Sequence, residues 1–331
     1  MPVTGGHIYM HLPRERRCGM GRRKKETVEL RFYEIPQGEP VLALLGEEWN
    51  RVYGHDSPYM HFHNLMEIGV CRNGEGVVVL DEKDYFYQNG TITIIPQNIS
   101  HTTISNGMQK NAWEYLYLNP DPVIAKLYDG QPAKSNEALQ LLRSGPLFLD
   151  AASYPFLMAQ IDAAMNEMRT QGMHYRQMVN ACLQAILIEV LRMQAKGQEH
   201  RLETSTSNNM RQISDALCYV ENHYAKAMKV KDLSVACGMS ETYFRRIFED
   251  YTHMTPMDYV NLVRVQKACE YMLQTEEAMD QIARKVGFTT VSTFNRNFKK
   301  FLDISPYQWK IKPDNYERKL QNYHITALKG W

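Results

Sequence analysis

Short runs of β-branched and aromatic residues, separated by turn residues, recur along residues 29–117. The runs at 85–87 and 91–95 have the length and composition of strands. Asn89-Gly90, which lies between them, is the strongest two-residue signal for a hairpin. The pattern therefore predicts an all-β domain over residues 29–150, folded as a closed or nearly closed antiparallel barrel.

The hydrophobic period changes to that of a helix between residues 155 and 196. Apolar side chains recur there at helical spacing, namely Ile161, Met165, Met168, Met178, Cys182, Ile186 and Val190. This spacing predicts two long helices within residues 151–200, each with one face packed inside the chain. Their other Met- and Leu-rich surfaces either pack on the barrel or form a dimer seam. Residues 201–209 are polar and aperiodic, which predicts a linker.

An internal repeat begins after residue 210, at an offset of about 50 residues. Residues 233–238 align with 282–287, and in each copy a small residue, Ser234 or Ala283, precedes a glycine by four positions. This arrangement is typical of a helix-turn-helix unit, in which the small residue lets two helices approach and the glycine takes a positive φ. The sequence therefore predicts an all-α domain with two such units over residues 210–311, followed by a C-terminal tail at 312–331.

The second helix of each unit carries the candidate DNA-binding residues. Phenylalanines four positions apart face the core, which leaves the intervening side chains for solvent or a ligand. The candidates are Ser240, Glu241, Thr242, Arg245 and Arg246 in the first copy, and Thr289, Thr290, Val291, Asn295, Arg296 and Lys299 in the second. Arg, Asn and Thr hydrogen-bond base edges in the major groove, and Lys contacts phosphates. The alternative is a solvated helix surface, but two matching units favour double-stranded DNA as the partner.

Residues 210–310 resemble the DNA-binding domain of the AraC/XylS family of bacterial transcription regulators. The resemblance is carried by the stretch 282–309, with Gly287-Phe288, the Phe294/Phe298 pair and Ser305-Pro306-Tyr307, and by Arg264 and Ala268 upstream. It implies that the two recognition helices enter successive major grooves about one helical turn apart. It also implies a homodimer, a contact with RNA polymerase and, most commonly, activation of transcription.

Two residues depart from the family's pattern. His253 and Asp303 stand where the family has a glycine after each recognition helix. Aspartate tolerates a positive φ better than histidine does, so we expect local strain there without loss of the fold.

The predicted barrel holds a second group of candidate residues. His61, His63 and Glu67 have the spacing of the first motif of cupins, and His101 lies in a stretch that resembles the second. In cupin enzymes three histidines and a glutamate bind a divalent metal. In regulators of this family similar residues serve without a metal, as wall or effector contacts. We expect the second role here, with no metal, no cofactor and no catalytic residue.

An aromatic set offers the apolar walls of an effector pocket, although a structural core explains at least half of its members equally well. The members are Tyr59, Phe62, Tyr85, Tyr87, Trp113, Tyr115 and Tyr117. Flat rings beside polar groups suit a sugar, so the expected effector is a neutral carbohydrate or a similar polar metabolite. Trp113 is the ring that we assign to the effector site together with the histidines.

Composition and charge narrow the class of protein. The chain has 331 residues, 44% hydrophobic and 23% charged, which indicates a folded protein of more than one domain. Residues 28–208 carry 13 basic and 21 acidic side chains, whereas residues 209–331 carry 18 and 14, so only the C-terminal part is basic. The basic residues 1–28 predict a disordered tail. No C-x-x-C pair occurs among the six cysteines, which we expect to be reduced.

These observations predict a ligand-responsive transcription regulator that activates carbohydrate or related metabolic genes, and no enzyme. No apolar run approaches the length of a membrane span, so the expected place is the bacterial cytoplasm, on the nucleoid. The alternative from another class is a metal-dependent cupin enzyme, an isomerase or a dioxygenase, with an accessory DNA-binding domain. Its distinguishing feature is the set His61, His63, Glu67 and His101.

Overall fold

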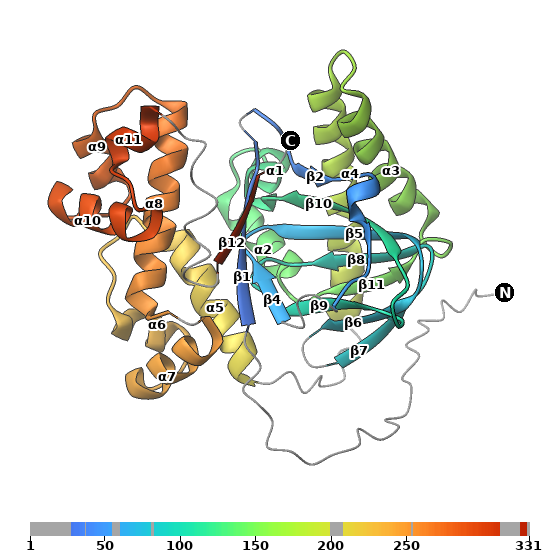
Figure 1. The fold of residues 1–331 in the computed structure, drawn as a ribbon, viewed down its shortest axis with the longest axis horizontal. Coiled ribbons are helices and arrows are strands. Elements are labelled where there is room, and N and C mark those ends of the chain that lie inside the picture. Colours follow the sequence, from blue (N-terminus) through green and yellow to red (C-terminus); the bar gives the residue numbers. More distant parts are fainter. Residues whose placement is uncertain are drawn as a thin grey trace.

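A β domain, covered on one side by helices, lies beside an all-helical domain (Figure 1). The structure is a computed structural model. It describes residues 28–36, 38–54, 60–80, 83–198, 208–252, 254–311 and 325–329. The basic segment 1–27, most of the predicted linker and His253 lie outside these ranges. The predicted fold class is confirmed: a β-rich domain is followed along the chain by a layer of helices and by an all-α domain with two helix-turn-helix units.

The β domain is built from two sheets. The first contains, in spatial order, β12 (Ile325–Lys329), β1 (Val28–Glu34), β4 (Met60–His63), β9 (His101–Ser105), β6 (Gly76–Leu80) and β7 (Lys83–Tyr87). The second contains β11 (Leu147–Asp150), β8 (Thr91–Ile95), β5 (Met66–Asn73), β10 (Asn111–Leu118) and β2 (Leu42–Leu44), with β3 (Asn50–Arg51) also paired to β10. A single core that includes Tyr33, Val78 and Trp113 draws on both sheets, because alternate strand residues face inward.

Two features of strand pairing differ from the sequence-based expectation. β1 pairs in parallel with β4 and β12, so the first sheet is not purely antiparallel. Asn89-Gly90 does not close a hairpin, because β7 and β8 belong to different sheets. The Gly90 amide donates to the Cys71 carbonyl at 2.9 Å and its carbonyl accepts from Ala151 at 2.8 Å. The turn therefore carries the chain from one sheet to the other.

Helices cover the outer face of the second sheet. They are α1 (Pro120–Leu127), α2 (Pro132–Leu142), α3 (Pro155–Thr170) and α4 (Tyr175–Gln198), preceded in the chain by the short helix η1 (Glu47–Trp49). α3 and α4 are the two long helices that the periodicity predicts. Ile68, Ile92 and Leu116 of the sheet share one buried core with Leu157 of α3 and Ile186 of α4. This shared core explains the inward face of each long helix.

α4 is the one helix in the described ranges with the length and apolar character of a membrane span. Its apolar side chains are already used inside the protein, since Val179, Leu183, Ile186 and Leu187 are fully buried against the sheet and its neighbours. The apolar character of α4 is therefore explained by its place in the core between the second sheet and its neighbouring helices.

The C-terminal domain contains only helices up to residue 311. They are α5 (Asn208–His223), α6 (Val230–Ala236), α7 (Glu241–Thr252), α8 (Pro256–Gln274), α9 (Met279–Lys285), α10 (Val291–Leu302) and α11 (Pro306–Ile311). α6 with α7, and α9 with α10, form the two helix-turn-helix units. Gly238 and Gly287 in their turns have φ of 65° and 94°, as the repeat predicts. Asp303 takes φ of 61° directly after α10 and so serves as the left-handed cap that replaces glycine.

α8 joins the two units and packs on both. Thr255 caps its start by accepting a hydrogen bond from the Asp258 amide at 3.2 Å, and Pro256 occupies the first turn, where no donor is lost. After α11 the chain returns to the β domain, where β12 pairs with β1 (Figure 1). The C-terminal tail thus includes a strand that the sequence does not predict.

Candidate DNA-binding and effector-binding sites

The two recognition helices, α7 and α10, present every predicted DNA-binding residue to solvent. Phe244 and Phe248 of α7, and Phe294 and Phe298 of α10, are fully buried, which turns the opposite face of each helix outward. The exposed residues are Ser240, Glu241, Thr242, Arg245, Arg246, Thr289, Thr290, Val291, Asn295, Arg296 and Lys299. The sequence pattern is therefore sufficient to place them on the surface.

Neighbouring contacts assign different roles to some of these side chains. Arg245 forms an ion pair with Glu241 at 2.7 Å, and the Arg246 guanidinium lies 5.1 Å from the centre of the Tyr243 ring. Thr290 accepts a hydrogen bond from the Thr293 amide at 3.1 Å and thereby caps α10. These contacts hold Arg245 and Arg246 against their helix, where their donors still face solvent.

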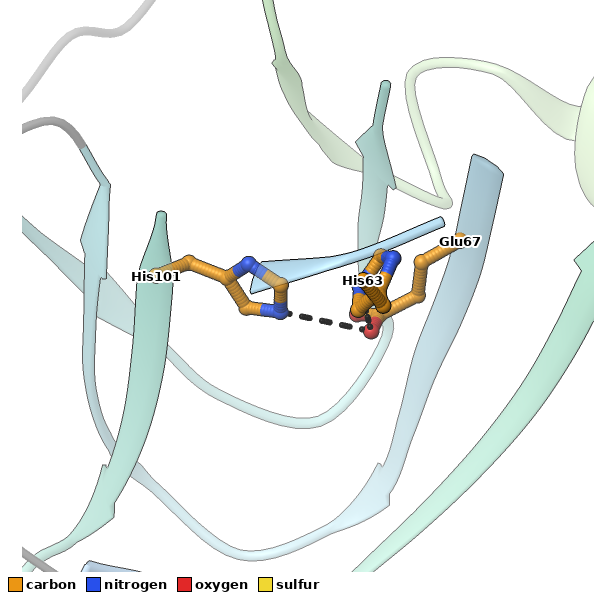
Figure 2. A group of neighbouring side chains, drawn as sticks. All are labelled: His63, Glu67 and His101. Carbon is orange, nitrogen blue, oxygen red and sulfur yellow. Dashed lines mark hydrogen bonds and ion pairs between the residues drawn. The ribbon is translucent and has the colours of Figure 1, made fainter. Parts of the chain in front are cut away.

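Inside the β domain, His63, Glu67 and His101 converge, and we call these three residues the sensor cluster (Figure 2). Their ligating atoms all lie within 4.8 Å of one another, and all three residues are buried. Glu67 Oε2 lies 3.1 Å from His63 Nε2 and 3.4 Å from His101 Nε2. It also accepts a hydrogen bond from the Tyr117 hydroxyl at 2.9 Å.

His63 and Glu67 do not lie on one regular strand, as their spacing would suggest. β4 ends at His63, and the chain turns at Asn64 and Leu65 before β5 begins in the other sheet. Glu67 therefore approaches His63 from the other sheet, and the two residues do not share a face of one strand. β9 brings His101 into the group because it pairs with β4 so that His101 lies opposite His61.

The ring nitrogens of the sensor cluster create an electrostatic conflict. His63 Nδ1 lies 2.7 Å from the Leu65 carbonyl oxygen, and His101 Nδ1 lies 2.9 Å from that of Ile99. A ring that donates to a carbonyl from Nδ1 needs a second proton to donate to Glu67 from Nε2. The carboxylate therefore favours doubly protonated rings. Burial opposes this and lowers the pKa of His63, outweighing the hydrogen bond to Glu67.

Glu67 itself is held in its charged form. Burial raises the pKa of its carboxyl, but the charge and hydrogen bonds of His101 and His63 more than offset that effect. The net pKa of Glu67 lies well below its ordinary value. The sensor cluster is therefore built around a buried carboxylate that stays charged.

His61 lies beside the sensor cluster and not in it. Its ring centre is 4.3 Å from that of His101, but its Nε2 lies 3.3 Å from an amino nitrogen of Arg31 on β1. The guanidinium places a positive charge at the edge of the group and contributes, after burial, to a pKa of His61 well below its ordinary value. His61 Nδ1 is buried and has no hydrogen-bond partner among the described residues.

Three members of the predicted aromatic set form a row of rings along β10, whereas Tyr85 and Tyr87 lie on β7 and Tyr59 lies outside the described residues. Trp113, Tyr115 and Tyr117 alternate on one strand face, with ring centres 5.8 Å and 6.1 Å apart, and Tyr117 meets His63 at 5.2 Å. Trp113 is 1% exposed and packs edge-on against Tyr87. Its indole nitrogen has no hydrogen-bond partner within the described part of the chain. Trp113 thus belongs to the core and also offers a free donor.

The β domain and the helical domain meet directly beside the sensor cluster. Phe62, between His61 and His63 on β4, is fully buried in the core of the helical domain. In the turn after β8, Gln97 donates to Glu221 of α5 at 3.1 Å, and Asn98 does so at 3.4 Å. Burial raises the pKa of Glu221 to about 7. We call Phe62, Gln97, Asn98 and Glu221 the domain interface.

Sequence reasoning missed Arg31 and the domain interface. Arg31 reaches His61 only because β1 and β4 pair in parallel, with Arg31 opposite His63, and no local pattern specifies that register. The sequence offers Phe62 as either a pocket wall or a core residue, and its place between two inward histidines on β4 is a signal that it faces away from the pocket. Gln97 and Asn98 lie more than 120 positions from Glu221, and this contact gives no sequence signal.

Two family models match the chain. The model of an AraC-like ligand-binding domain matches residues 48–206, and that of a helix-turn-helix domain matches residues 233–311. The HTH-type transcriptional activator RhaS of Citrobacter koseri is 22% identical over 258 residues, 74% of this chain and 85% of the relative. The uncharacterized HTH-type transcriptional regulator YisR of Bacillus subtilis is 31% identical over 96 residues, 29% of this chain and 33% of the relative.

Among solved structures, ToxT of Vibrio cholerae with a bound unsaturated fatty acid aligns with 82% of this chain and 94% of its own. The identity is 15% and the TM-score 0.36. Both family models and both relatives concern regulators or their domains. The alternative of a metal-dependent cupin enzyme therefore receives no support from the comparisons.

Proposed function

The chain belongs to the AraC/XylS family of bacterial transcription regulators, and from that membership we propose that it activates its target promoters in response to a small effector. The observation that carries the proposal is the pair of helix-turn-helix units whose recognition residues are all exposed. A sensor domain with a polar buried cluster stands next to them. The relative RhaS is named a transcriptional activator, which supports the sign of regulation.

The DNA contacts that we propose divide into two kinds. Arg245, Arg246, Asn295 and Arg296 have side chains that hydrogen-bond base edges, and Lys299 at the end of α10 suits a phosphate. Thr290 caps its own helix, so its hydroxyl is already engaged and its share in base reading is small.

The effector that we propose is a neutral carbohydrate or a similar polar metabolite. A hydroxyl group of the effector could hydrogen-bond to His101 Nε2, a buried atom without a hydrogen-bond partner in the described ranges. His61 Nδ1 and the Trp113 indole nitrogen are further buried polar atoms without partners in the described ranges, and such atoms normally find a ligand or water. His61, His63, Glu67, His101 and Trp113 are therefore the proposed effector contacts.

The same residues do not hold a resident metal in our proposal, although two imidazoles and a carboxylate have the donor chemistry of a divalent-metal site. The fourth candidate ligand, His61, is engaged by Arg31, whose positive charge disfavours a nearby cation. Metal analysis of the purified protein should find well below one equivalent. One equivalent that disappears in His63→Ala would contradict the proposal and favour a metal-dependent sensor or enzyme.

Effector binding would reach the DNA-binding domain through β4 and the turn after β8. On β4, the interface residue Phe62 lies directly between His61 and His63. In the turn after β8, the amide of the interface residue Asn98 donates to the His63 carbonyl at 2.8 Å. A shift of His63 or His101 is thus transmitted to Phe62 and Glu221 without an intervening flexible segment.

The assembly that we propose is a homodimer in the bacterial cytoplasm that contacts RNA polymerase at the promoter. Phe156 of α3 and Met178 of α4 are more than half exposed, which supports the helical layer as the dimer surface. Two chains would double the number of DNA contacts and steepen the salt dependence of binding.

The proposal is tested by a survey of sugars and related metabolites. We expect one class to raise the melting temperature and to increase transcription from a bound promoter in a purified system. Equal melting temperature, DNA affinity and transcription with every compound would contradict effector control. His101→Gln serves as the matched variant that should weaken the response without changing DNA affinity.

A further inference from the structure

A single buried arginine ties the two helix-turn-helix units together. Arg264 lies in the middle of α8 and is 7% exposed. Its Nε donates to the Tyr224 carbonyl and its Nη2 to the Lys226 carbonyl, both at 2.8 Å. These carbonyls belong to the loop between α5 and α6, on the side of the first unit.

The turn of the second unit meets the same loop from the other side. A Cβ on Gly287 would lie 2.6 Å from the Tyr224 carbonyl oxygen and 2.9 Å from that of Ala225, so the two backbones are in direct contact. Phe288, 3% exposed, packs under Arg264, with the guanidinium carbon 5.6 Å from its ring centre. The arginine therefore fixes the turn of the second unit on the loop of the first.

Arg264 is not part of an ion pair in the described ranges, since both of its hydrogen bonds go to backbone carbonyls. Burying a charge without a carboxylate partner costs free energy. The planar guanidinium of Arg264 instead bridges two carbonyls at fixed positions, so its main contribution is to the geometry of the contact. The guanidinium thereby links α8 to the loop between α5 and α6, on which the turn of the second unit also rests.

The geometry points to Arg264 as the positioning residue that sets the spacing between the two DNA segments read by α7 and α10, an inference that rests on the proposed DNA binding. Inserting one base pair between the segments rotates one against the other by about 35° and shifts it by about 3.4 Å. Two rigidly held units cannot bind both segments after this insertion, whereas two loosely held units can adjust and bind both.

The test selects binding sites from random double-stranded DNA with the full-length protein. Wild type should recover two short blocks at one separation, and insertion of one base pair should weaken binding about tenfold or more. Arg264→Gln should recover the same blocks over several separations, with an insertion penalty below about threefold. Arg192→Gln, an exposed arginine of α4 that pairs with Glu189, is the matched control and should behave as wild type.

Arg264→Lys keeps the charge but cannot bridge both carbonyls, so it should also relax the spacing. A folded variant that keeps the single separation and the full insertion penalty overturns the inference. Loss of folding in both variants also overturns it, in favour of a purely structural role. If wild type recovers no paired blocks, the proposed function fails as well, which distinguishes that result from failure of Arg264 alone.

Discussion

At the scale of the residue, Glu67 is the centre of the sensor domain because hydrogen bonds from His63 and Tyr117 and the ring of His101 converge on one of its oxygens. Its neighbourhood combines residues that the sequence motif identifies with one that it does not. His63, Glu67 and His101 are recognised from their spacing, whereas Arg31 is recruited by strand register and cannot be found from local pattern. Sequence motifs therefore predict only some residues of a buried site, because its charge balance also depends on residues that are far away in the sequence.

Replacement of Glu67 by Gln tests this charge balance. The variant should be less stable by about 1–3 kcal/mol at pH 7, because buried donors lose their carboxylate acceptor. Since the folded-state pKa of Glu67 lies below its unfolded value of about 4.3, its stabilisation is complete above that pH and is lost as the pH falls further. Urea unfolding of both proteins at pH 5 and pH 3 measures the difference, and a difference that does not shrink at pH 3 would contradict the account.

Arg296 tests the recognition helices at the same scale. Because its side chain is exposed, Arg296→Ala should change stability by less than about 0.5 kcal/mol. Loss of a base contact should weaken binding to a specific site by about 1–3 kcal/mol while leaving nonspecific binding nearly unchanged. Fluorescence anisotropy with specific and random DNA measures both, with Arg192→Ala on α4 as control. Equal weakening on both DNAs would reassign Arg296 to a phosphate contact.

At the scale of the element, the helical domain was predictable and the sheet pairing was not. Each helix-turn-helix unit is specified by local signals, a glycine in the turn, two buried phenylalanines and a capped start, which reinforce one another over few residues. Strand partners depend on long-range contacts instead. Asn89-Gly90 has the local chemistry of a hairpin turn, yet its backbone hydrogen bonds go to Cys71 and Ala151 and direct the chain into the second sheet.

The contact between α5 and the turn after β8 predicts a pH dependence. Burial raises the pKa of Glu221 to about 7, above its unfolded value of about 4.3. The stability contributed by the protonated carboxyl is therefore lost as the pH rises from about 4.3 through 7 and stays constant above that. Glu221→Gln should lack this decline and become the more stable protein at pH 8.

Thermal unfolding between pH 5 and pH 8 gives the comparison. Glu270→Gln on the exposed side of α8 is the control and should follow wild type. Parallel curves for wild type and Glu221→Gln across this range would show that the domain interface does not bury the charge of Glu221.

At the scale of the whole molecule, the domains are linked both through packing and through the chain. Phe62 is buried in the helical core, and β12 returns from the helical domain to pair with β1. The recognition faces remain exposed in this arrangement. The recognition helix α7 also lies against β1 of the sensor domain. We therefore expect control by an effector to act on the relation between the two domains.

The most direct measurement of the central claim is genome-wide DNA occupancy of the tagged protein in its source bacterium, followed by titration on the recovered sites at several salt concentrations. The account predicts a few sharp sites, each with two short blocks about one helical turn apart, and affinities that fall steeply with salt. Diffuse occupancy, with no site bound more tightly than nonspecific DNA in the presence or absence of the candidate effectors, would contradict it.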